Sequence, residues 1–163
     1  MRAAVRLQTL GFDQVYRYAD GKTDWAASGL PIEGEHAQVP RLLDIAERDV
    51  PTCRLSDSLA EVRARDGRLC VVTDEHGVIL GQLTESRLRS DGGGSVEEVM
   101  EPGPASYRPN VSLEELWSRL EQHPRVQHVL VSTPEGELLG VVWRKDLEEV
   151  VKGEHEHAHA HAD

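Results

Sequence analysis

The chain has 163 residues, a formal net charge of −11 and only 4% aromatic residues, so it is long enough for one ordinary domain or two small ones with a modest aliphatic core. The negative charge disfavours nucleic-acid binding, which depends on Lys and Arg neutralising phosphates. No apolar run is long enough to span a bilayer, and the first six residues lack the apolar core of a signal peptide, so we expect a cytoplasmic protein that binds neither membranes nor nucleic acids.

Residues 1 to 35 predict a short helix-strand-helix segment. Apolar residues at helical spacing run from Ala3 to Leu10, and Gly11 is a typical helix stop. The pair Val15-Tyr16 suggests a short strand, and Asp24 could cap a last turn that contains Trp25.

These features, together with Gly21-Lys22 and Gly29-Leu30-Pro31, resemble the closing segment of a rhodanese-like sulfurtransferase domain. In that family the nucleophilic Cys lies in a loop just before the helix that Ala3 and Ala4 would continue. The resemblance implies either a structural appendage, with Trp25 packed against the rest of the protein, or a truncated sulfurtransferase. Persulfide transfer requires a thiolate, and Cys53 and Cys70 lie too far along the chain to supply it.

A linker and a lead-in helix are predicted over residues 36 to 47. The stretch from Glu33 to Val39 is polar and lies between two prolines, as linkers often do. Residues 41 to 47 could then form a short amphipathic helix.

Two copies of one supersecondary unit follow, over residues 48 to 97 and 98 to 151. Residues 69 to 81 correspond to residues 128 to 140, which indicates an internal repeat. Each copy predicts strand, helix, strand, strand and helix, and Val96 to Met100 predict a short connecting helix.

Three local patterns support this order in each copy. Ser58 with Glu61, and Ser112 with Glu115, have the spacing of a capping box at a helix start. Short apolar runs then predict buried strands, and a turn that ends in glycine predicts a hairpin. Cys53 and Cys70 fall in strand-like segments, where reduced and buried thiols are expected.

The repeat, its hairpins and its element order resemble the CBS domain family, whose domains occur in tandem pairs called Bateman modules. The resemblance covers roughly residues 48 to 151. It implies an α+β fold of two β-α-β-β-α units packed as a pseudo-two-fold pair. It also implies a non-enzymatic regulatory module, a homodimer through these units, and an adenosine-containing ligand of the AMP, ADP, ATP or S-adenosylmethionine class in the cleft between them.

The family writes its ligand motif as Gly-x-x-Thr/Ser-x-x-Asp, with the hydroxyl meeting a phosphate and the carboxylate a ribose diol. The first copy keeps Thr84 but has Arg87 at the carboxylate position. The second keeps Asp146 but has Trp143 at the hydroxyl position. The resemblance therefore implies at most one conventional nucleotide site, on the Asp146 side, and the candidate ligand-binding residues are Asp146, Trp143, Arg144, Lys145, Thr84 and Arg87.

Each candidate has a structural alternative. An Asp in the first turn of a helix is favoured by the macrodipole, and Thr84 could simply be a helix N-cap. The basic residues could be solvated charges, and Trp143 could stack on a base, plug the site or pack between the units. If Arg87 and Trp143 have abolished both pockets, the protein is a ligand-free dimerisation or interaction module.

The last twelve residues, 152 to 163, predict a flexible tail rich in histidine. Its imidazoles could chelate a divalent transition metal such as zinc, nickel or copper, with His155, His157, His159 and His161 as the candidate ligands. The alternative is a solvated tail with no selected role. No cofactor is required by any of these interpretations.

Overall fold

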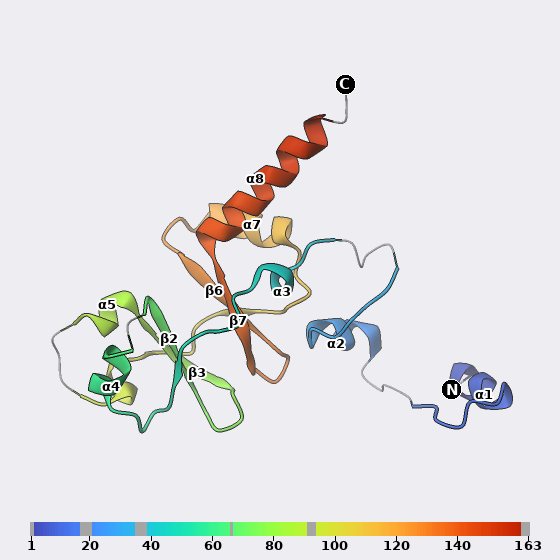
Figure 1. Ribbon diagram of the computed structural model, residues 1–163, viewed down its shortest axis with the longest axis horizontal. Helices are drawn as coiled ribbons and strands as arrows, with labels where there is room; N and C mark the ends of the chain where they lie inside the picture. The colour runs from blue at the N-terminus through green and yellow to red at the C-terminus, as the bar shows by residue number, and fades with distance from the viewer. Residues whose placement is uncertain (1, 17–20, 35–38, 66, 91–93, 161–163) are drawn as a thin grey trace.

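Two small sheets, one for each repeat, form the body of the protein and give the mixed α+β fold that the sequence predicts (Figure 1). The computed structural model describes residues 2–16, 21–34, 39–65, 67–90 and 94–160. The first sheet has the order β1-β2-β3-β4, with bounds Thr52–Cys53, Leu69–Thr73, Ile79–Thr84 and Glu101–Pro102. The second has the order β5-β6-β7, with bounds Ser106–Tyr107, His128–Ser132 and Leu138–Trp143. In both, the first strand pairs parallel with the second, and the second pairs antiparallel with the third.

The helices divide between the same two units (Figure 1). The first core contains buried side chains from α4 and α6, and the second contains side chains from α3, α7 and α8. The bounds are α3 Leu42–Ile45, α4 Leu59–Arg63, α5 Glu85–Leu88, α6 Val96–Val99, α7 Leu113–Glu121 and α8 Arg144–Ala160. The lead-in helix, the connecting helix and the repeated unit are therefore present in the predicted order.

The central strands are buried on both faces, which explains their unbroken apolar runs. All five residues of β2 are buried. Cys70 and Val72 pack into the core of the first unit, whereas Leu69 and Val71 face Leu130 and Val141 of the second unit. The contact between the units is therefore itself an apolar core.

Both hairpins turn on a glycine with positive φ, as predicted. Gly77 has φ 81° and Gly136 has φ 91°, which a residue without Cβ adopts without strain. The two hairpin tips also bind each other, because Ile79 N donates to Gly136 O at 3.0 Å and Leu138 N donates to Gly77 O at 3.0 Å.

Each unit is tied to the other by its lead-in segment. Glu47, which precedes β1, pairs with Val141 of β7, and Glu101, which precedes β5, pairs with Gln82 of β3. Each crossing requires a glycine, since a Cβ at Gly140 would lie 2.7 Å from Glu47 O and a Cβ at Gly81 would lie 2.9 Å from Glu101 O. The sequence interpretation treats residues 101 to 104 as a joint and does not predict strand β4.

Of the two predicted capping boxes, one forms only its serine half and the other does not form. Helix α7 begins after Ser112, whose hydroxyl accepts a hydrogen bond from Glu115 N at 3.2 Å. Helix α4 also begins where predicted, but the Ser58 hydroxyl makes no capping bond. The Ser58 backbone forms an antiparallel bridge with Ser95, and the reciprocal capping box forms at Ser95 with Glu98 instead.

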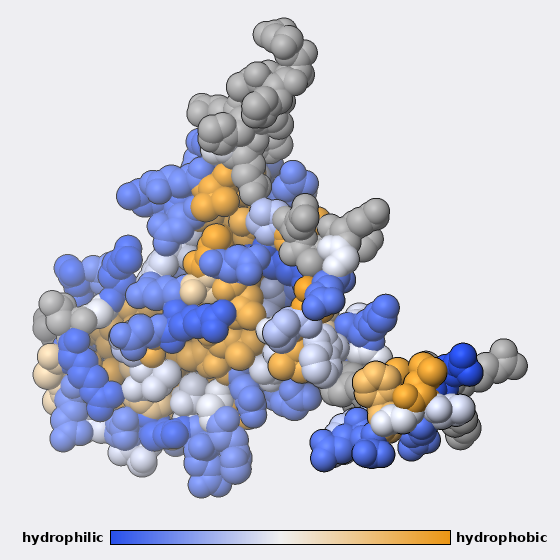
Figure 2. Space-filling model, turned by 45° about the vertical axis from the view of Figure 1, so that its right-hand side comes forward, coloured by the Kyte–Doolittle hydropathy of each residue, from blue (hydrophilic) through white to orange (hydrophobic). Residues whose placement is uncertain are grey.

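The N-terminal segment contains helices α1, Arg2–Thr9, and α2, Gly21–Ala27. The strand predicted at Val15-Tyr16 is wrong, because no strand lies beside these residues in the described part of the chain. Figure 2 shows apolar surface on this segment, where Leu7, Leu10 and Phe12 are exposed.

The N-terminal segment approaches the body through the turn after α2. A Cβ at Gly29 would meet Leu43, Pro109 and Leu139 of the second unit. The indole of Trp25, predicted to pack against the body, donates a 2.7 Å hydrogen bond to Pro31 O within its own segment. The rhodanese-like origin of residues 1 to 35 remains a prediction.

Helix α8 continues to Ala160 and so includes most of the segment predicted as a tail, whose flexibility remains a prediction. Three of the candidate metal ligands, His155, His157 and His159, lie on this helix, and His161 lies outside the described residues. Among the residues whose side chains are described, which leave out residues 154 to 160, no three His, Cys, Asp or Glu side chains come together as a metal site. No helix in the described part of the chain is long and apolar enough to cross a membrane.

Candidate functional site

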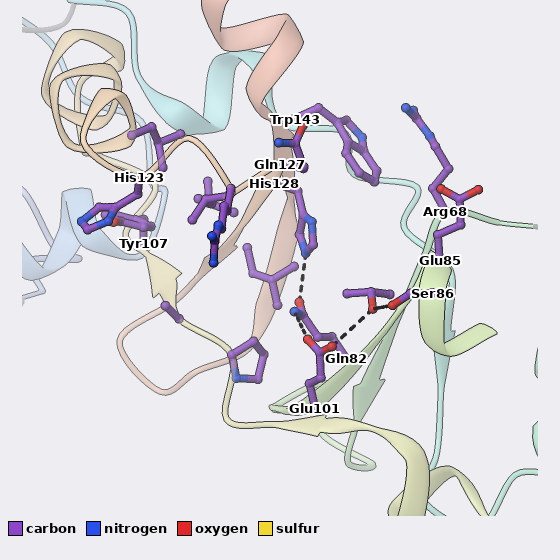
Figure 3. A pocket seen from close by; sticks show the side chains of 18 of the residues that line it. Arg68, Gln82, Glu85, Ser86, Glu101, Tyr107, His123, Gln127, His128 and Trp143 are labelled. Atoms are coloured by element: carbon purple, nitrogen blue, oxygen red, sulfur yellow. Dashed lines mark hydrogen bonds between the residues drawn. The ribbon is translucent and has the colours of Figure 1, made fainter. Parts of the chain in front are cut away.

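A cleft of about 750 Å³ opens between the two units (Figure 3). Its volume lies within the range of roughly 300–1,000 Å³ that is usual for small-molecule sites. Both units and the joint between them supply its walls, which include Arg68, Gln82, Thr84, Glu101, His128, Trp143 and Lys145.

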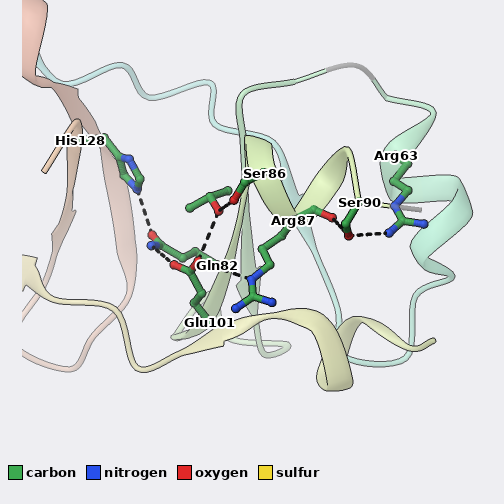
Figure 4. A network of polar contacts seen from close by, with 8 residues as sticks. Arg63, Gln82, Ser86, Arg87, Ser90, Glu101 and His128 are labelled. Atoms are coloured by element: carbon green, nitrogen blue, oxygen red, sulfur yellow. Dashed lines mark hydrogen bonds and ion pairs between the residues drawn. The ribbon is translucent and has the colours of Figure 1, made fainter. Parts of the chain in front are cut away.

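A chain of hydrogen bonds crosses one wall of the cleft (Figures 3 and 4). His128 Nε2 lies 3.0 Å from Gln82 Oε1, and Gln82 Nε2 donates to Glu101 Oε2 at 3.1 Å. Thr84 Oγ1 donates to the other carboxylate oxygen, Glu101 Oε1, at 3.3 Å. Because Gln82 Oε1 can only accept, the neutral His128 ring carries its proton on Nε2.

The environment of His128 favours this neutral form. Burial lowers the pKa of His128 below its ordinary value of 6.5, and the nearby carboxylate of Glu101 opposes the shift only in part. The imidazole is therefore an uncharged hydrogen-bond donor near neutral pH.

Arg87, which stands at the family's carboxylate position, turns to Glu101. Its Nε lies 3.7 Å from Glu101 Oε1, forming an ion pair between two partly exposed side chains (Figure 4). Arg87 is not among the residues that line the cleft.

Trp143, which stands at the hydroxyl position of the second copy, is held from three directions. Its Nε1 donates to Glu47 Oε2 at 2.7 Å, and the Arg68 guanidinium lies 4.3 Å from the ring centre. The His128 ring is tilted against it, with 5.5 Å between the ring centres. Of the alternatives considered for Trp143, packing between the units describes its contacts, although its side chain also borders the cleft (Figure 3).

Two differences between the repeats lie on their facing strands, one on each side of the contact between the units. The first copy places Leu69 where the second places His128, and the second places Val141 where the first places Gln82. Leu69 and Val141 are buried together in the apolar core between the units. On the other side, His128 and Gln82 form a hydrogen-bonded polar wall, and the cleft lies there.

The remaining candidates from the second copy have separate roles. Arg144 donates to the backbone oxygens of Leu120 at 2.8 Å and His123 at 3.3 Å, so it holds the loop after α7. Lys145 borders the cleft, whereas Asp146 is exposed in the first turn of α8 and does not line it.

The cleft therefore brings together three of the six predicted ligand residues, namely Thr84, Trp143 and Lys145. Sequence reasoning missed Gln82, Glu101 and His128. Gln82 and His128 could have been found by comparing the repeats, because the equivalent positions hold the apolar residues Val141 and Leu69. Glu101 gave no such signal, because its strand was interpreted as a joint.

Comparisons with known proteins identify the two repeats. Residues 42–91 and 96–153 each match the CBS domain family. A search of curated proteins finds no match.

Several solved structures share the fold. The pair of protein MJ0100, in complex with 5′-methylthioadenosine and S-adenosyl-L-methionine, is 16% identical with a TM-score of 0.60, over 71% of this chain and 98% of that chain. CBSX2, in complex with AMP, is 18% identical with a TM-score of 0.59, over 70% and 97%. The cytosolic domain of the Mg2+ channel MgtE, in complex with ATP, is 24% identical with a TM-score of 0.60 over 71% of this chain, which spans only 51% of that chain.

Proposed function

This chain belongs to the CBS domain family, and on that premise we propose that it is a non-enzymatic regulatory module that binds an adenosine-containing ligand between its two units. The cleft beside His128, Gln82 and Glu101 is the observation that carries the proposal. Similar CBS pairs bind ligands of this class, namely AMP, ATP, and S-adenosyl-L-methionine with 5′-methylthioadenosine.

The cleft offers the chemistry that such a ligand needs. Trp143 and Tyr107 supply aromatic surface, and Gln82 and Glu101 supply directional polar groups. The cations Arg68, Arg125 and Lys145 also line it and could bind an anionic part of the ligand. Asp146, one residue beyond Lys145, stays a predicted contact.

A thermal-shift experiment with AMP, ADP, ATP and S-adenosylmethionine tests the proposal. A ligand at 100 times its dissociation constant adds about 2.7 kcal/mol to the free energy of unfolding. We expect at least one of the four to raise the unfolding temperature, and Lys145→Ala to reduce that rise. The matched control is Lys152→Ala, which removes an exposed lysine from the same helix, away from the cleft.

A second function is favoured by the contacts of Trp143, which is already engaged by Glu47 and Arg68. In that case the protein is a dimerisation or interaction module that needs no ligand. It predicts no thermal shift with any nucleotide, and a dimer mass by light scattering that nucleotides leave unchanged. A shift with any of the four compounds contradicts this second function.

The proposal does not extend to sulfurtransferase chemistry. Cys53 and Cys70 are free thiols, each only 3% exposed. The hydrogen bond with Cys53 and burial raise the pKa of Cys70 far above its usual range, so this thiol stays protonated. A persulfide-transfer reaction needs an accessible thiolate, and both sulfur atoms are buried.

A further inference from the structure

Glu101 is a carboxylate held in a fixed orientation at the cleft wall. The Gln82 amide binds one oxygen at 3.1 Å and the Thr84 hydroxyl binds the other at 3.3 Å. A carboxylate has about four acceptor positions, so these two bonds leave acceptor capacity unused. The Glu101 side chain is 40% exposed, and it borders the cleft.

The Thr84 hydroxyl donates its proton to Glu101, and this fixes the direction of the next hydrogen bond. An ionised carboxylate only accepts, so Thr84 Oγ1 must donate to Glu101. The Ser86 hydroxyl, 3.2 Å from Thr84 Oγ1, then donates to Thr84. A phosphate at this position would compete for the Thr84 proton and would place its negative charge next to a carboxylate.

Arg87 supports this arrangement. Its guanidinium offsets part of the Glu101 charge from 3.7 Å, a distance that leaves the carboxylate oxygens free to accept shorter bonds. Other cations that line the cleft, Arg68 and Lys145, are not paired with Glu101. An anionic group of a ligand would therefore bind toward those residues.

We infer that Glu101 is the carboxylate that recognises the ligand, replacing the one absent at position 87, and that the Thr84 end of the cleft binds hydroxyl donors of a ribose. This inference rests on the proposed function. It gives the ligand a direction in the cleft, with its sugar hydroxyls at Glu101 and any phosphate away from Thr84. A charge-assisted hydrogen bond then becomes the main source of specificity for the sugar.

Isothermal titration calorimetry with adenosine, 2′,3′-dideoxyadenosine and AMP tests the inference on the full chain. We expect wild-type protein to bind adenosine at least about tenfold more tightly than the dideoxy compound, the change expected for a bond to a charged group. Glu101→Gln should weaken adenosine binding by a similar factor and abolish this preference. The control Glu97→Gln makes the same change of charge at an exposed position of α6 and should alter neither value.

The outcomes separate the two proposals. If wild-type protein binds none of the three compounds, this inference fails, and the proposed function fails with it if ADP, ATP and S-adenosylmethionine also give no thermal shift. If it binds AMP or adenosine but shows no preference for the sugar hydroxyls, or if Glu101→Gln leaves adenosine binding unchanged, only the inference fails. The preference of wild-type protein is measured without any variant, so the test does not depend on Glu101→Gln folding normally.

Discussion

Thr84 and Trp143 occupy the same position in the two repeats, and each donates its polar hydrogen to the glutamate of the segment that crosses its strand. Thr84 Oγ1 donates to Glu101 at 3.3 Å, and Trp143 Nε1 donates to Glu47 at 2.7 Å. The two units are therefore joined by equivalent bonds, although the side chains that donate them differ in size and chemistry. Both side chains border the same cleft.

The indole bond of Trp143 should contribute measurably to stability. Trp143→Phe keeps an aromatic ring but removes the hydrogen bond to Glu47, and we expect a loss of about 1 kcal/mol in the free energy of unfolding. Urea denaturation of the wild type, Trp143→Phe, Glu47→Gln and the double variant measures the coupling. Strict additivity of the two single changes would show that the pair does not interact.

Gly140 should not tolerate a side chain. A Cβ there would lie 2.7 Å from Glu47 O, so Gly140→Ala must displace the crossing segment, at a cost of about 1–3 kcal/mol. Gly153→Ala is the control, because it lies in α8 with no neighbouring atom within 4 Å. There the change should stabilise the protein by about 0.5–1 kcal/mol. Equal changes in stability for Gly140→Ala and Gly153→Ala would contradict the close approach of Glu47 O to Gly140.

Arg144 and Lys145 are adjacent, but substitution of Arg144 should lower stability much more than substitution of Lys145. Arg144→Met removes donors to the carbonyl oxygens of Leu120 and His123, and we expect it to lower the free energy of unfolding by about 1–3 kcal/mol. Lys145→Ala should change stability by less than about 0.5 kcal/mol, since this side chain is exposed. Chemical denaturation gives both values, and a large loss for Lys145→Ala would refute the distinction.

The His128 imidazole should make stability depend on pH. Burial lowers the pKa of His128 below 6.5, so in mildly acidic solution the unfolded chain binds this proton more readily than the folded protein. The stability contributed by the neutral imidazole is complete above pH 6.5 and is lost as the pH falls through the lowered pKa of His128. We expect the wild type to lose more stability than His128→Gln when the pH is lowered from about 7.5 to about 5. Parallel curves for the two proteins would rule out this contribution.

The scaffold was predictable because its signals are local and repeated. Apolar runs, hairpin glycines and helix starts recur in both copies, and each reports the conformation of a few neighbouring residues. The site was less predictable, because it depends on pairs that are distant in the chain. Glu101 meets Thr84, and Glu47 meets Trp143, only after the lead-in segments cross to the opposite sheet.

The motif at the end of each unit correctly indicated which segments lie near the cleft, but it did not indicate which side chains reach it. Thr84, Trp143 and Lys145 reach the cleft, whereas Arg144 turns to the loop after α7. The strand predicted at Val15-Tyr16 was wrong for a different reason. A short apolar pair forms a strand only when another strand is available to pair with it.

A crystal structure of the protein with bound adenosine tests the central claim most directly. The account predicts electron density for one nucleoside in the cleft between the units, with a ribose hydroxyl within hydrogen-bond distance of Glu101. Density only on the solvent-exposed side of α8 beside Asp146, or an empty cleft at saturating adenosine in a crystal that leaves it open, would contradict the account.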